Sequence, residues 1–398
     1  MAGFVTLPFW AAGLVAGASS LYAASLTISA AVQRPRRKAA VQPLTPRTRF
    51  AVLVPAHNES LLIRRTLRSL QSLDYPRGLA DIYVIADNCG DDTAEIARSC
   101  GVQVLERHDL DRRGKGYALD WALGQIALSD YDAVAMFDAD TVAGSGFLRA
   151  MDARLAGGAE AVQGYYAVLH PESTAEALRS ISFALMHYVR PLGKEPFRGS
   201  CGLKGNGMAF SVRLLQEVGW KSFSVVEDAE QGLRIVDAGH RVEFAPEARI
   251  EGEMPGSLRG ARTQNLRWEA GRWMVARRWS LPLLARGLRR RSLAAIDAAL
   301  EPMVPPLSVV VALGAVSALG GFLLGSQALA ALGLASLAGV ALHVIGGMMV
   351  AGVPPKAWRA LLAAPLYLAW KVALYAQALL GVGARRWVRT PRTTSPEE

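Results

Sequence analysis

The distribution of apolar residues divides this chain of 398 residues into membrane-type and globular segments. Residues 1–33 contain no charged side chain, and no Asp, Glu, Lys or Arg lies between Glu301 and Lys356. A helix needs about 20 apolar residues to cross the ~30 Å hydrocarbon core of a bilayer. The pattern therefore predicts one transmembrane helix in residues 1–33 and two in residues 302–355, joined by a turn near residues 325–327.

Positive charge follows the N-terminal apolar segment, at residues 34–38. A cleaved signal peptide is the alternative to a membrane helix, but its basic region would precede the apolar run. Because Lys and Arg favour the cytoplasmic side of a membrane, we expect the basic linker, residues 34–49, to face the cytoplasm. The N-terminus is then expected to lie outside.

Between residues 50 and 255 the pattern changes to short β-rich runs that alternate with helical stretches. Strands are expected at 51–55, 82–86, 102–105 and 133–137, and helices at 59–72, 92–99 and 116–128. This alternation predicts an α/β domain with a mostly parallel sheet that is covered on both faces. Ligands of such sheets bind outside the carboxyl ends of the strands, so the residues directly after each strand are the functional candidates.

The remaining segments combine apolar residues with basic and aromatic ones. Residues 256–301 are predicted to form amphipathic helices at the membrane surface. For residues 356–384 the pattern leaves open an interfacial or re-entrant helix and a third C-terminal span. The span would place the four arginines that follow it outside, and the positive-inside bias therefore favours the interfacial arrangement. Residues 385–398 are expected to form a basic and then disordered tail.

Composition supports membrane association over two other classes. Hydrophobic residues make up 51% of the chain, more than in a soluble domain of average composition. The net charge is +10, but the arginines cluster beside the apolar segments, so no nucleic-acid partner is expected. The three cysteines are an odd number without CxxC spacing, which indicates neither a zinc site nor a disulfide framework.

Acidic residues follow two of the predicted strands. Asp87 follows the second strand, where its carboxylate can accept hydrogen bonds from a base or ribose; capping the helix that starts near Asp92 is the alternative. Asp138 and Asp140 follow the fourth strand, and side chains two residues apart in an extended chain point the same way. Two neighbouring carboxylates repel unless a cation lies between them. This pair therefore predicts Mg²⁺ or Mn²⁺ held jointly with a diphosphate, with a solvated turn as the alternative.

A second acidic pair, Glu227 and Asp228, precedes a predicted helix at 229–238. Negative charge is favoured at the N-terminus of a helix, so simple capping explains the pair. The functional alternative is a carboxylate base that takes the proton from an attacking sugar hydroxyl. On these residues alone the two interpretations are equally supported.

The last motif, Gln264, Arg267 and Trp268, lies in an Arg- and Trp-rich segment at 257–279. Arg267 offers a donor fork for phosphate oxygens, and Trp268 offers a flat face for a sugar ring. An aromatic and basic belt at the membrane surface is the alternative.

In this order and with these separations, the four motifs resemble those of the family 2 glycosyltransferases that include the cellulose, hyaluronan and poly-N-acetylglucosamine synthases. The similarity covers about residues 50–273, together with the flanking spans. It implies a GT-A fold, which is Rossmann-like, a nucleoside diphosphate sugar donor, usually linked to UDP, and inversion at the anomeric carbon. Mg²⁺ or Mn²⁺ is the implied cofactor.

The resemblance also implies roles for individual residues. The implied donor contacts are Asp87, Lys115, Asp138, Gln264 and Arg267. The implied metal contacts are Asp138 and Asp140, and the implied base is Asp228. The implied acceptor contacts are Trp268, Glu227, Gly205, Asn206 and Gly207, where glycine lets the backbone approach a ligand closely.

We therefore expect a multi-pass transferase in a bacterial-type inner membrane, with its catalytic domain on the cytoplasmic face. The expected acceptor is a growing polysaccharide or a glycolipid, and membrane lipids surround the spans. Single addition to a membrane lipid is an alternative, favoured by the small number of spans. An inactive partner subunit that only binds nucleotide-sugar is a second alternative, opposed by the intact carboxylates. Oligomers or accessory subunits are compatible with each of these functions.

Overall fold

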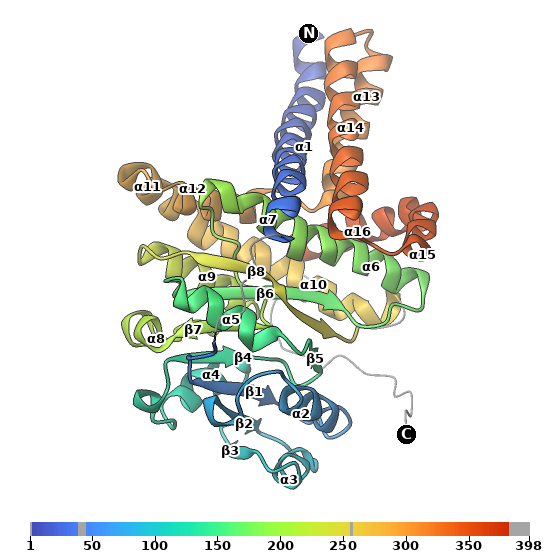
Figure 1. Cartoon of the computed structure of the whole chain (residues 1–398). Coiled ribbons are helices and arrows are strands. Elements are labelled where there is room, and N and C mark those ends of the chain that lie inside the picture. Colours follow the sequence, from blue (N-terminus) through green and yellow to red (C-terminus); the bar gives the residue numbers. More distant parts are fainter. Residues whose placement is uncertain (1, 39–44, 255–257, 382–398) are drawn as a thin grey trace.

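The computed structural model describes residues 2–38, 45–254 and 258–381. Figure 1 shows three long helices that stand on an α/β body, and further helices lie between this bundle and the sheet. The bundle consists of α1 (Ala2–Lys38), α13 (Leu307–Leu323) and α14 (Gln327–Ala351). The division into membrane-type and globular parts thus follows the pattern of apolar residues.

The described part of the sheet has eight strands in the order β3-β2-β1-β4-β7-β6-β8-β5. They are β1 (Phe50–Ala56), β2 (Ala80–Asp87), β3 (Gln103–Arg107), β4 (Ala133–Met136), β5 (Thr141–Ala143), β6 (Ala161–Val168), β7 (Met208–Ser211) and β8 (Val242–Gly252). The pairs β3–β2, β2–β1, β1–β4 and β6–β8 are parallel, whereas β4–β7, β7–β6 and β8–β5 are antiparallel. The sheet is therefore mixed, and the expected parallel arrangement describes its β1–β4 half.

Helices lie on both sides of the sheet and between the sheet and the bundle. Those beside the sheet are α2 (Ile63–Gln71), α3 (Thr93–Ser99), α4 (Lys115–Leu123), α5 (Phe147–Ala156), α8 (Val212–Val218) and α9 (Glu227–Asp237). Those nearer the bundle are α6 (Thr174–Ala184), α7 (Arg190–Lys194), α10 (Leu258–Val275), α11 (Leu281–Arg290), α12 (Leu293–Leu300), α15 (Pro355–Trp358) and α16 (Ala364–Leu379). Two π-helical turns, η3 (Leu185–Val189) and η5 (Ala276–Ser280), continue α6 and α10.

Strand β1 shows why both faces of the sheet are covered by packed helices. Its alternate residues Phe50, Val52 and Val54 belong to the core formed with α2, α3 and α5. Ala51 and Leu53 point the other way, into the core formed with α4, α6 and α8. Successive side chains of a strand point to opposite faces, so this run of apolar residues needs cover on each face. Ligands are consequently restricted to the ends of the strands.

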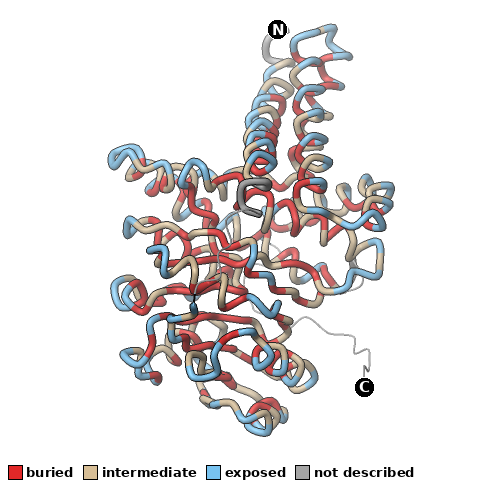
Figure 2. The backbone as a smooth tube through the Cα atoms, viewed as in Figure 1, coloured by how far each residue is buried: buried red, intermediate tan, exposed pale blue. Residues whose placement is uncertain are grey.

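The bundle carries the features expected of membrane-crossing helices. Residues 6–33 of α1 and α14 are each long and apolar enough to cross a membrane. The 17-residue α13 joins them as a third candidate if it is combined with the segment 293–303, which meets it at an angle of 71°. Large apolar side chains such as Leu21, Phe322 and Leu342 are exposed on the outside of these helices. Figure 2 shows exposed and buried residues alternating along the helices of the bundle.

Helix α16 packs along α10 at the base of the bundle. Lys371 of α16 donates hydrogen bonds to Asn265 Oδ1 at 2.9 Å and to Glu269 Oε1 at 2.8 Å, both on α10. α16 is not among the candidate spans of the described residues. The interfacial arrangement and the third C-terminal span both stay predictions, and the expected tail at 385–398 lies outside the described residues. Helix α1 continues through Lys38, so the start of the expected linker is helical.

The α/β body is joined to the bundle by a close contact between α7 and α1. A Cβ on Gly193 would lie 2.2 Å from the backbone oxygen of Leu26, so only glycine allows this approach. Ser29 Oγ donates a hydrogen bond to the Gly193 carbonyl oxygen at 2.8 Å. The core on this face of the sheet continues through η3 and α7 to Met348 at the lower end of α14. Sheet and bundle therefore share one continuous apolar core.

We expect Gly193→Ala to loosen this junction. The added methyl group would overlap the α1 backbone, and overpacking of this kind costs about 1–3 kcal/mol. The thermal unfolding midpoint of the purified protein in detergent should fall, and the α7 amides should exchange hydrogen faster. Gly78→Ala is the matched control, because a Cβ at Gly78 meets nothing within 4 Å. Equal midpoints for the two variants would show that the contact does not hold the bundle to the body.

Candidate active site

Two carboxylates leave the sheet at the end of β4. Every residue of β4 is buried, and the chain reaches a cavity at Asp138 and Asp140. The antiparallel register pairs Met136 with Met208, which places residues 205–207 beside this end of β4. The sheet therefore brings together two motifs that lie 68 residues apart in the sequence.

Asn206 ties the loop after β4 to the loop before β7. Its side-chain oxygen accepts a hydrogen bond from the Asp138 amide at 3.1 Å, and its side-chain nitrogen donates to Thr141 Oγ1 at 2.8 Å. Asn206 and Gly207 are fully buried and do not line the cavity. Among residues 205–207, which the resemblance implies as acceptor contacts, only Gly205 lines the cavity. We therefore assign Asn206 a positioning role behind the carboxylate loop.

Lys115 places a positive charge among the acidic side chains. It is the first residue of α4, and its Nζ donates hydrogen bonds to Asp138 Oδ1 and to the carbonyl oxygen of Gly205. Burial disfavours the ammonium charge, but the carboxylates of Asp138 and Glu227 outweigh this effect and raise the pKa of Lys115. Lys115 is therefore a cation at neutral pH and joins α4 to the loops around β4 and β7.

A second pair of carboxylates lies at the N-terminus of α9. Glu227 and Asp228 are among its first residues, and both line the cavity. Burial raises the pKa of Asp228, and burial together with the adjacent Asp228 charge raises the pKa of Glu227 to about 7. A Cβ on Gly205 would lie 3.2 Å from Asp228 Oδ2, so the glycine keeps this side of the carboxylate open. Carboxylates with a raised pKa in a cavity are suited to accept a proton.

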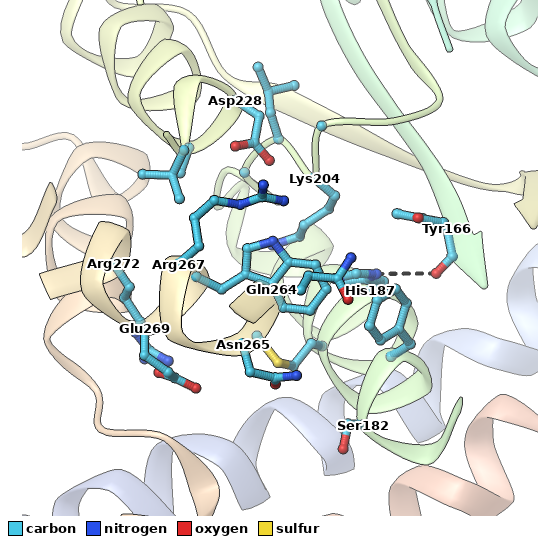
Figure 3. Close-up of a pocket in the computed structure, with 18 of the residues that line it drawn as sticks. Tyr166, Ser182, His187, Lys204, Asp228, Gln264, Asn265, Arg267, Glu269 and Arg272 are labelled. Carbon is cyan, nitrogen blue, oxygen red and sulfur yellow. Dashed lines mark hydrogen bonds between the residues drawn. The ribbon is translucent and has the colours of Figure 1, made fainter. Parts of the chain in front are cut away.

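Helix α10 supplies the third group of predicted residues. Gln264, Arg267 and Trp268 line the same cavity as Asp228. Figure 3 shows Arg267 and Lys204 on the side of the pocket where Asp228 lies. The positive charge of Lys204 partly offsets the rise in the pKa of Asp228. The carboxylates and the cations of the site thus come from separate elements that converge on one space.

Aromatic rings form the wall next to Trp268. Between ring centroids, Phe183 lies 6.2 Å from Trp268 and 4.4 Å from His187, and Tyr166 stacks on His187 at 5.6 Å. His187 Nδ1 lies 3.2 Å from the Tyr166 carbonyl oxygen, so this nitrogen carries the proton and donates it. Burial lowers the pKa of His187 to about 3, so the ring is neutral and Nε2 is a hydrogen-bond acceptor. The ring belongs to the π-helical turn η3, a distortion that is frequent at functional sites.

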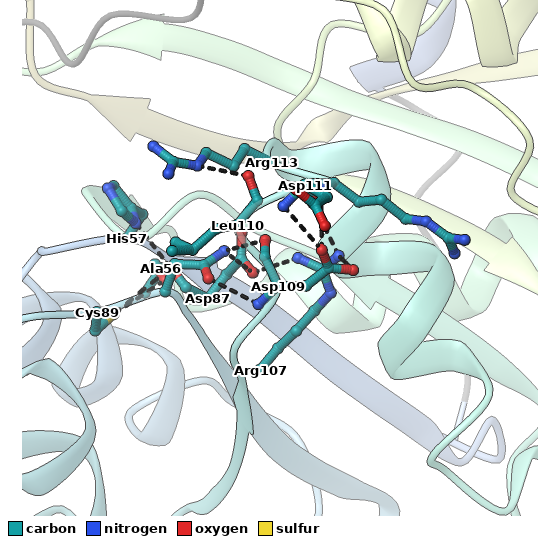
Figure 4. A network of polar contacts seen from close by, with 11 residues as sticks. Ala56, His57, Asp87, Cys89, Arg107, Asp109, Leu110, Asp111 and Arg113 are labelled. Atoms are coloured by element: carbon teal, nitrogen blue, oxygen red, sulfur yellow. Dashed lines mark hydrogen bonds and ion pairs between the residues drawn. The ribbon is translucent and has the colours of Figure 1, made fainter.

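Asp87 is held by a buried ion pair at the end of β2, drawn in Figure 4. Arg107 Nη1 donates to Asp87 Oδ1 at 2.6 Å, and these side chains are only 4% and 9% exposed. Asn88 Nδ2 donates to the same oxygen at 2.9 Å, and His57 Nδ1 donates to the Asp87 carbonyl oxygen at 2.7 Å. The network fixes the direction in which the carboxylate faces the cavity.

These groups open into one cavity of about 1520 Å³. At one end it is lined by the acidic residues that follow β2 and β4, and in the middle by α9 and α10. At the other end its lining includes Ser19 of α1, Val310 of α13 and His343 of α14. A single space therefore connects the ends of the strands with the membrane-type bundle.

Comparison with known proteins agrees with this geometry. A model of the family described as glycosyltransferase like family 2 matches residues 46–271, which is more than half of the chain. The chain belongs to the family 2 glycosyltransferases. It is 25% identical over 244 residues to the probable glycosyltransferase YdaM of Bacillus subtilis, a match that covers 57% of this chain and 56% of that protein. The aligned part thus spans about half the length of this curated relative.

The solved structure of a mannosyltransferase shows the same fold. The mannosyltransferase PcManGT from Pyrobaculum calidifontis, solved with GDP-Man and Mn²⁺, is 19% identical with a TM-score of 0.58 over 93% of this chain and 99% of that one. Glucosyl-3-phosphoglycerate synthase from Mycobacterium tuberculosis, solved with Mn²⁺, UDP and phosphoglyceric acid, is 20% identical with a TM-score of 0.41 over 58% and 78%. The same synthase has also been solved with Mg²⁺ and UDP. The predicted family and GT-A fold are confirmed.

The acidic pair after β4 of this family 2 glycosyltransferase fits a divalent ion shared with a ligand. Burial raises the pKa of Asp138 and the charge of Asp140 adds to the rise, whereas Lys115 opposes it. The described residues contain no group of three or more His, Cys, Asp or Glu side chains arranged around a metal. Two carboxylates that repel each other suit Mg²⁺ or Mn²⁺ whose other ligands are diphosphate oxygens and water.

Three residues of the site were missed by sequence reasoning. Arg107 is the last residue of β3, and its only signal was a basic residue two positions after the β-rich run 102–105. Lys204 directly precedes the glycine motif in the sequence. His187 carried no signal, because its place at the wall depends on a π-helical turn that apolar periodicity does not reveal.

We expect Arg107→Met to destabilise the protein strongly. The substitution leaves the Asp87 carboxylate buried without its cation, and breaking a buried pair in this way costs about 3–5 kcal/mol. The double variant Asp87→Asn with Arg107→Met should regain most of the thermal unfolding midpoint, because it buries no unpaired charge. Arg98→Met is the matched control, since the pair of Arg98 with Glu106 is exposed and worth at most about 1 kcal/mol. Similar losses for Arg98→Met and Arg107→Met would contradict the assignment.

Proposed function

We propose that this enzyme is an inverting, metal-dependent glycosyltransferase embedded in a membrane. It transfers a sugar from a nucleoside diphosphate sugar, with UDP as the favoured nucleotide, to a growing polysaccharide or a glycolipid. The observation that carries the proposal is the single cavity that joins the carboxylates of the strand ends to α10 and to the bundle. A donor that dissolves in water and an acceptor held at a membrane can meet in such a space.

The donor is proposed to lie across the ends of β2 and β4. Asp87, oriented by its buried ion pair, accepts hydrogen bonds from the base or ribose, and Lys115 and Asp138 contact the nucleotide. Arg267 and Gln264 of α10 bind the diphosphate, because a guanidinium fork matches phosphate oxygens. With the donor bound by these residues, we expect its anomeric carbon to lie between β4 and α9, beside Asp228.

Asp228 is proposed to act as the general base. Its carboxylate takes the proton of the acceptor hydroxyl while the oxygen attacks the anomeric carbon from the side opposite the diphosphate. The new bond to the acceptor forms as the bond to the phosphate oxygen breaks, and one displacement inverts the anomeric centre. Trp268, Glu227 and Gly205 border the acceptor at this point.

Asp138 and Asp140 are the residues that would hold Mg²⁺ or Mn²⁺. The ion would neutralise negative charge that develops on the departing diphosphate. Lys115 and Arg267 assist this from the protein, since both are cations close to the same carboxylates. The nucleoside diphosphate leaves by the open end of the cavity at the strand ends.

The membrane arrangement of the proposal follows the bundle and the basic segments. α1, α13 and α14 cross a bacterial-type inner membrane with the N-terminus outside, and the α/β body faces the cytoplasm. α16 lies in the interface beside α10, to which Lys371 binds it. Three spans form a narrow bundle, and this favours single addition to a membrane lipid as the second candidate function.

Asp228→Asn should abolish transfer and preserve nucleotide binding. Loss of a general base typically lowers the rate by about 10²–10⁴-fold, whereas Asn and Asp cap helices about equally well. Sugar transfer and calorimetric binding of the nucleoside diphosphate are the two measurements. Asp120→Asn is the matched control, because Asp120 of α4 forms an exposed ion pair with Lys221, away from the cavity lining. Transfer by Asp228→Asn within a few-fold of the wild type would assign Asp228 to capping alone.

The same substitution should change the pH profile. The base works only when ionised, so kcat/KM of the wild type should rise as the pH increases through the pKa of Asp228. Burial raises this pKa above the usual aspartate value of about 4. The Asn variant should lack this acidic limb, and an unchanged limb would point to another carboxylate.

Metal removal provides an independent test of the proposed chemistry. Excess chelator should stop the release of nucleoside diphosphate from a panel of nucleotide-sugars, and Mn²⁺ or Mg²⁺ should restore it. Asp140→Asn should weaken Mn²⁺ binding, measured by electron paramagnetic resonance with nucleoside diphosphate present. Asp130→Asn, at an exposed position, is the control and should bind Mn²⁺ normally. Full turnover in excess chelator would refute the metal assignment.

A further inference from the structure

The cavity continues past the sugar-transfer site to the base of the bundle, where its lining changes. Apolar side chains from α13 and α14 line this end, with small residues of α1 completing it. They are Ala23, Leu307, Val310, Val311, Val340 and Val344. Such a lining is suited to an acyl or isoprenoid chain and gives a water-soluble saccharide no hydrogen-bond partners.

One buried cation borders this apolar end. Arg190, the first residue of α7, lines the cavity and is only 8% exposed. Its guanidinium carbon lies 5.5 Å from the ring centroid of Tyr22 on α1. Among the described residues, the Nε of Arg190 has no hydrogen-bond partner. A buried guanidinium of this kind is costly unless an anion pairs with it.

The nearby carboxylates are already engaged. Lys194 Nζ lies 2.9 Å from Asp297 Oδ2 and 2.7 Å from Glu301 Oε2. Asp297 also accepts a hydrogen bond from the Tyr22 hydroxyl at 2.8 Å. The printed contacts of these two acids go to Lys194 and Tyr22, and among the described residues no ion pair joins either acid to Arg190, which lines the cavity.

Arg190 lies close to the cytoplasmic boundary of the hydrocarbon core in the proposed arrangement. Tyr22 lies 16 residues after Thr6, the start of the apolar part of α1. At about 1.5 Å per residue this is ~24 Å along the helix, compared with a hydrocarbon core of ~30 Å. His343, at the same end of the cavity, lies 16 residues after the start of α14. Arg190 is thus placed near the cytoplasmic boundary of the core, if α1 crosses it as proposed.

Lys204 separates this cation from the proposed base. A Cβ on Gly202 would lie 3.7 Å from Lys204 Nζ and 3.8 Å from Glu301 Oε2, so these two groups flank the same glycine. The charge of Lys204 also acts on Asp228. Arg190, Lys204 and Asp228 line the same cavity, so a headgroup paired with Arg190 has to extend along this cavity to meet the base.

We propose that the acceptor is a membrane lipid whose headgroup joins a phosphate to a hydroxyl-bearing polyol or sugar. The phosphate pairs with Arg190, the lipid chain occupies the apolar end of the cavity, and the hydroxyl reaches Asp228. This rests on the second candidate function, single addition to a membrane lipid, and specifies the chemistry of that lipid. Charge complementarity at a buried site, together with the apolar lining, distinguishes this acceptor from neutral glycolipids and from free saccharides.

The test compares defined lipids in phosphatidylcholine vesicles that contain the full-length protein. Phosphatidylglycerol carries both phosphate and hydroxyl, diacylglycerol carries a hydroxyl without phosphate, and soluble glycerol phosphate lacks the lipid chain. With the donor that binds best, transfer of sugar is expected to phosphatidylglycerol and to neither of the others. Equal or faster transfer to diacylglycerol, or transfer to glycerol phosphate alone, would overturn the proposal.

Variants of Arg190 test the assignment of the charge. Arg190→Met should raise the KM for phosphatidylglycerol roughly tenfold to a hundredfold, since a charge-assisted hydrogen bond contributes about 1.5–3 kcal/mol. The donor KM should stay the same, and Arg190→Lys should regain part of the lipid affinity. Arg198→Met, which removes an exposed arginine from the neighbouring turn, is the control and should leave the lipid KM unchanged.

Two further readouts separate this inference from the proposed function. Native mass spectrometry of the purified protein should detect retained phosphatidylglycerol with the wild type and less of it with Arg190→Met. Failure of every nucleotide-sugar to bind would reject the proposed function itself. Normal donor binding with an unchanged lipid KM and unchanged lipid retention in Arg190→Met would reject only the role of Arg190.

Discussion

Repulsion among carboxylates is the constraint on which the site depends. Asp138, Glu227 and Asp228 converge from two separate elements, and burial makes their charges harder to sustain. The positive charge of Lys115 reduces this repulsion. Lys115 binds Asp138 and the backbone before β7, and these contacts hold α4 and both loops in one arrangement. The loop behind them is fixed by Asn206. The cluster is therefore prearranged to receive cationic charge, and it remains open to the cavity.

The parallel half of the sheet and its motifs were predictable because their signals are local. Continuous apolar runs defined β1, β2 and β4, and the acidic residues directly after β2 and β4 lie at the cavity as expected. The antiparallel pairs of the other half were not anticipated, because β5 and β7 have only three and four residues, and their direction depends on distant partners. For the same reason the Arg107 ion pair and the His187 wall required the structure. Both depend on contacts across about 20 residues of sequence.

Helix α10 connects the cavity at the strand ends to the helices at the base of the bundle. On one face it carries Gln264, Arg267 and Trp268 toward the cavity. Two further contacts hold α10 in place. Lys371 of α16 binds Glu269 of α10, and Arg272 of α10 donates hydrogen bonds to the backbone oxygens of residues 301, 302 and 304, just before α13. The positions of Gln264, Arg267 and Trp268 are therefore set by the same elements that meet the bundle.

The contact of Gly193 with the α1 backbone also has a geometric consequence. Helix α7 packs directly on α1 and shares a core with the sheet. The α/β body therefore cannot shift along the axis of the bundle without breaking the contact between α7 and α1. The reacting centre is thereby kept at one height relative to the helices. A molecule anchored beside the bundle would then be selected by the length of its headgroup. A short headgroup would not reach the carboxylates, and a long one would extend past them. Through this contact, Gly193 would determine which length of headgroup can bring its reactive end to the carboxylates.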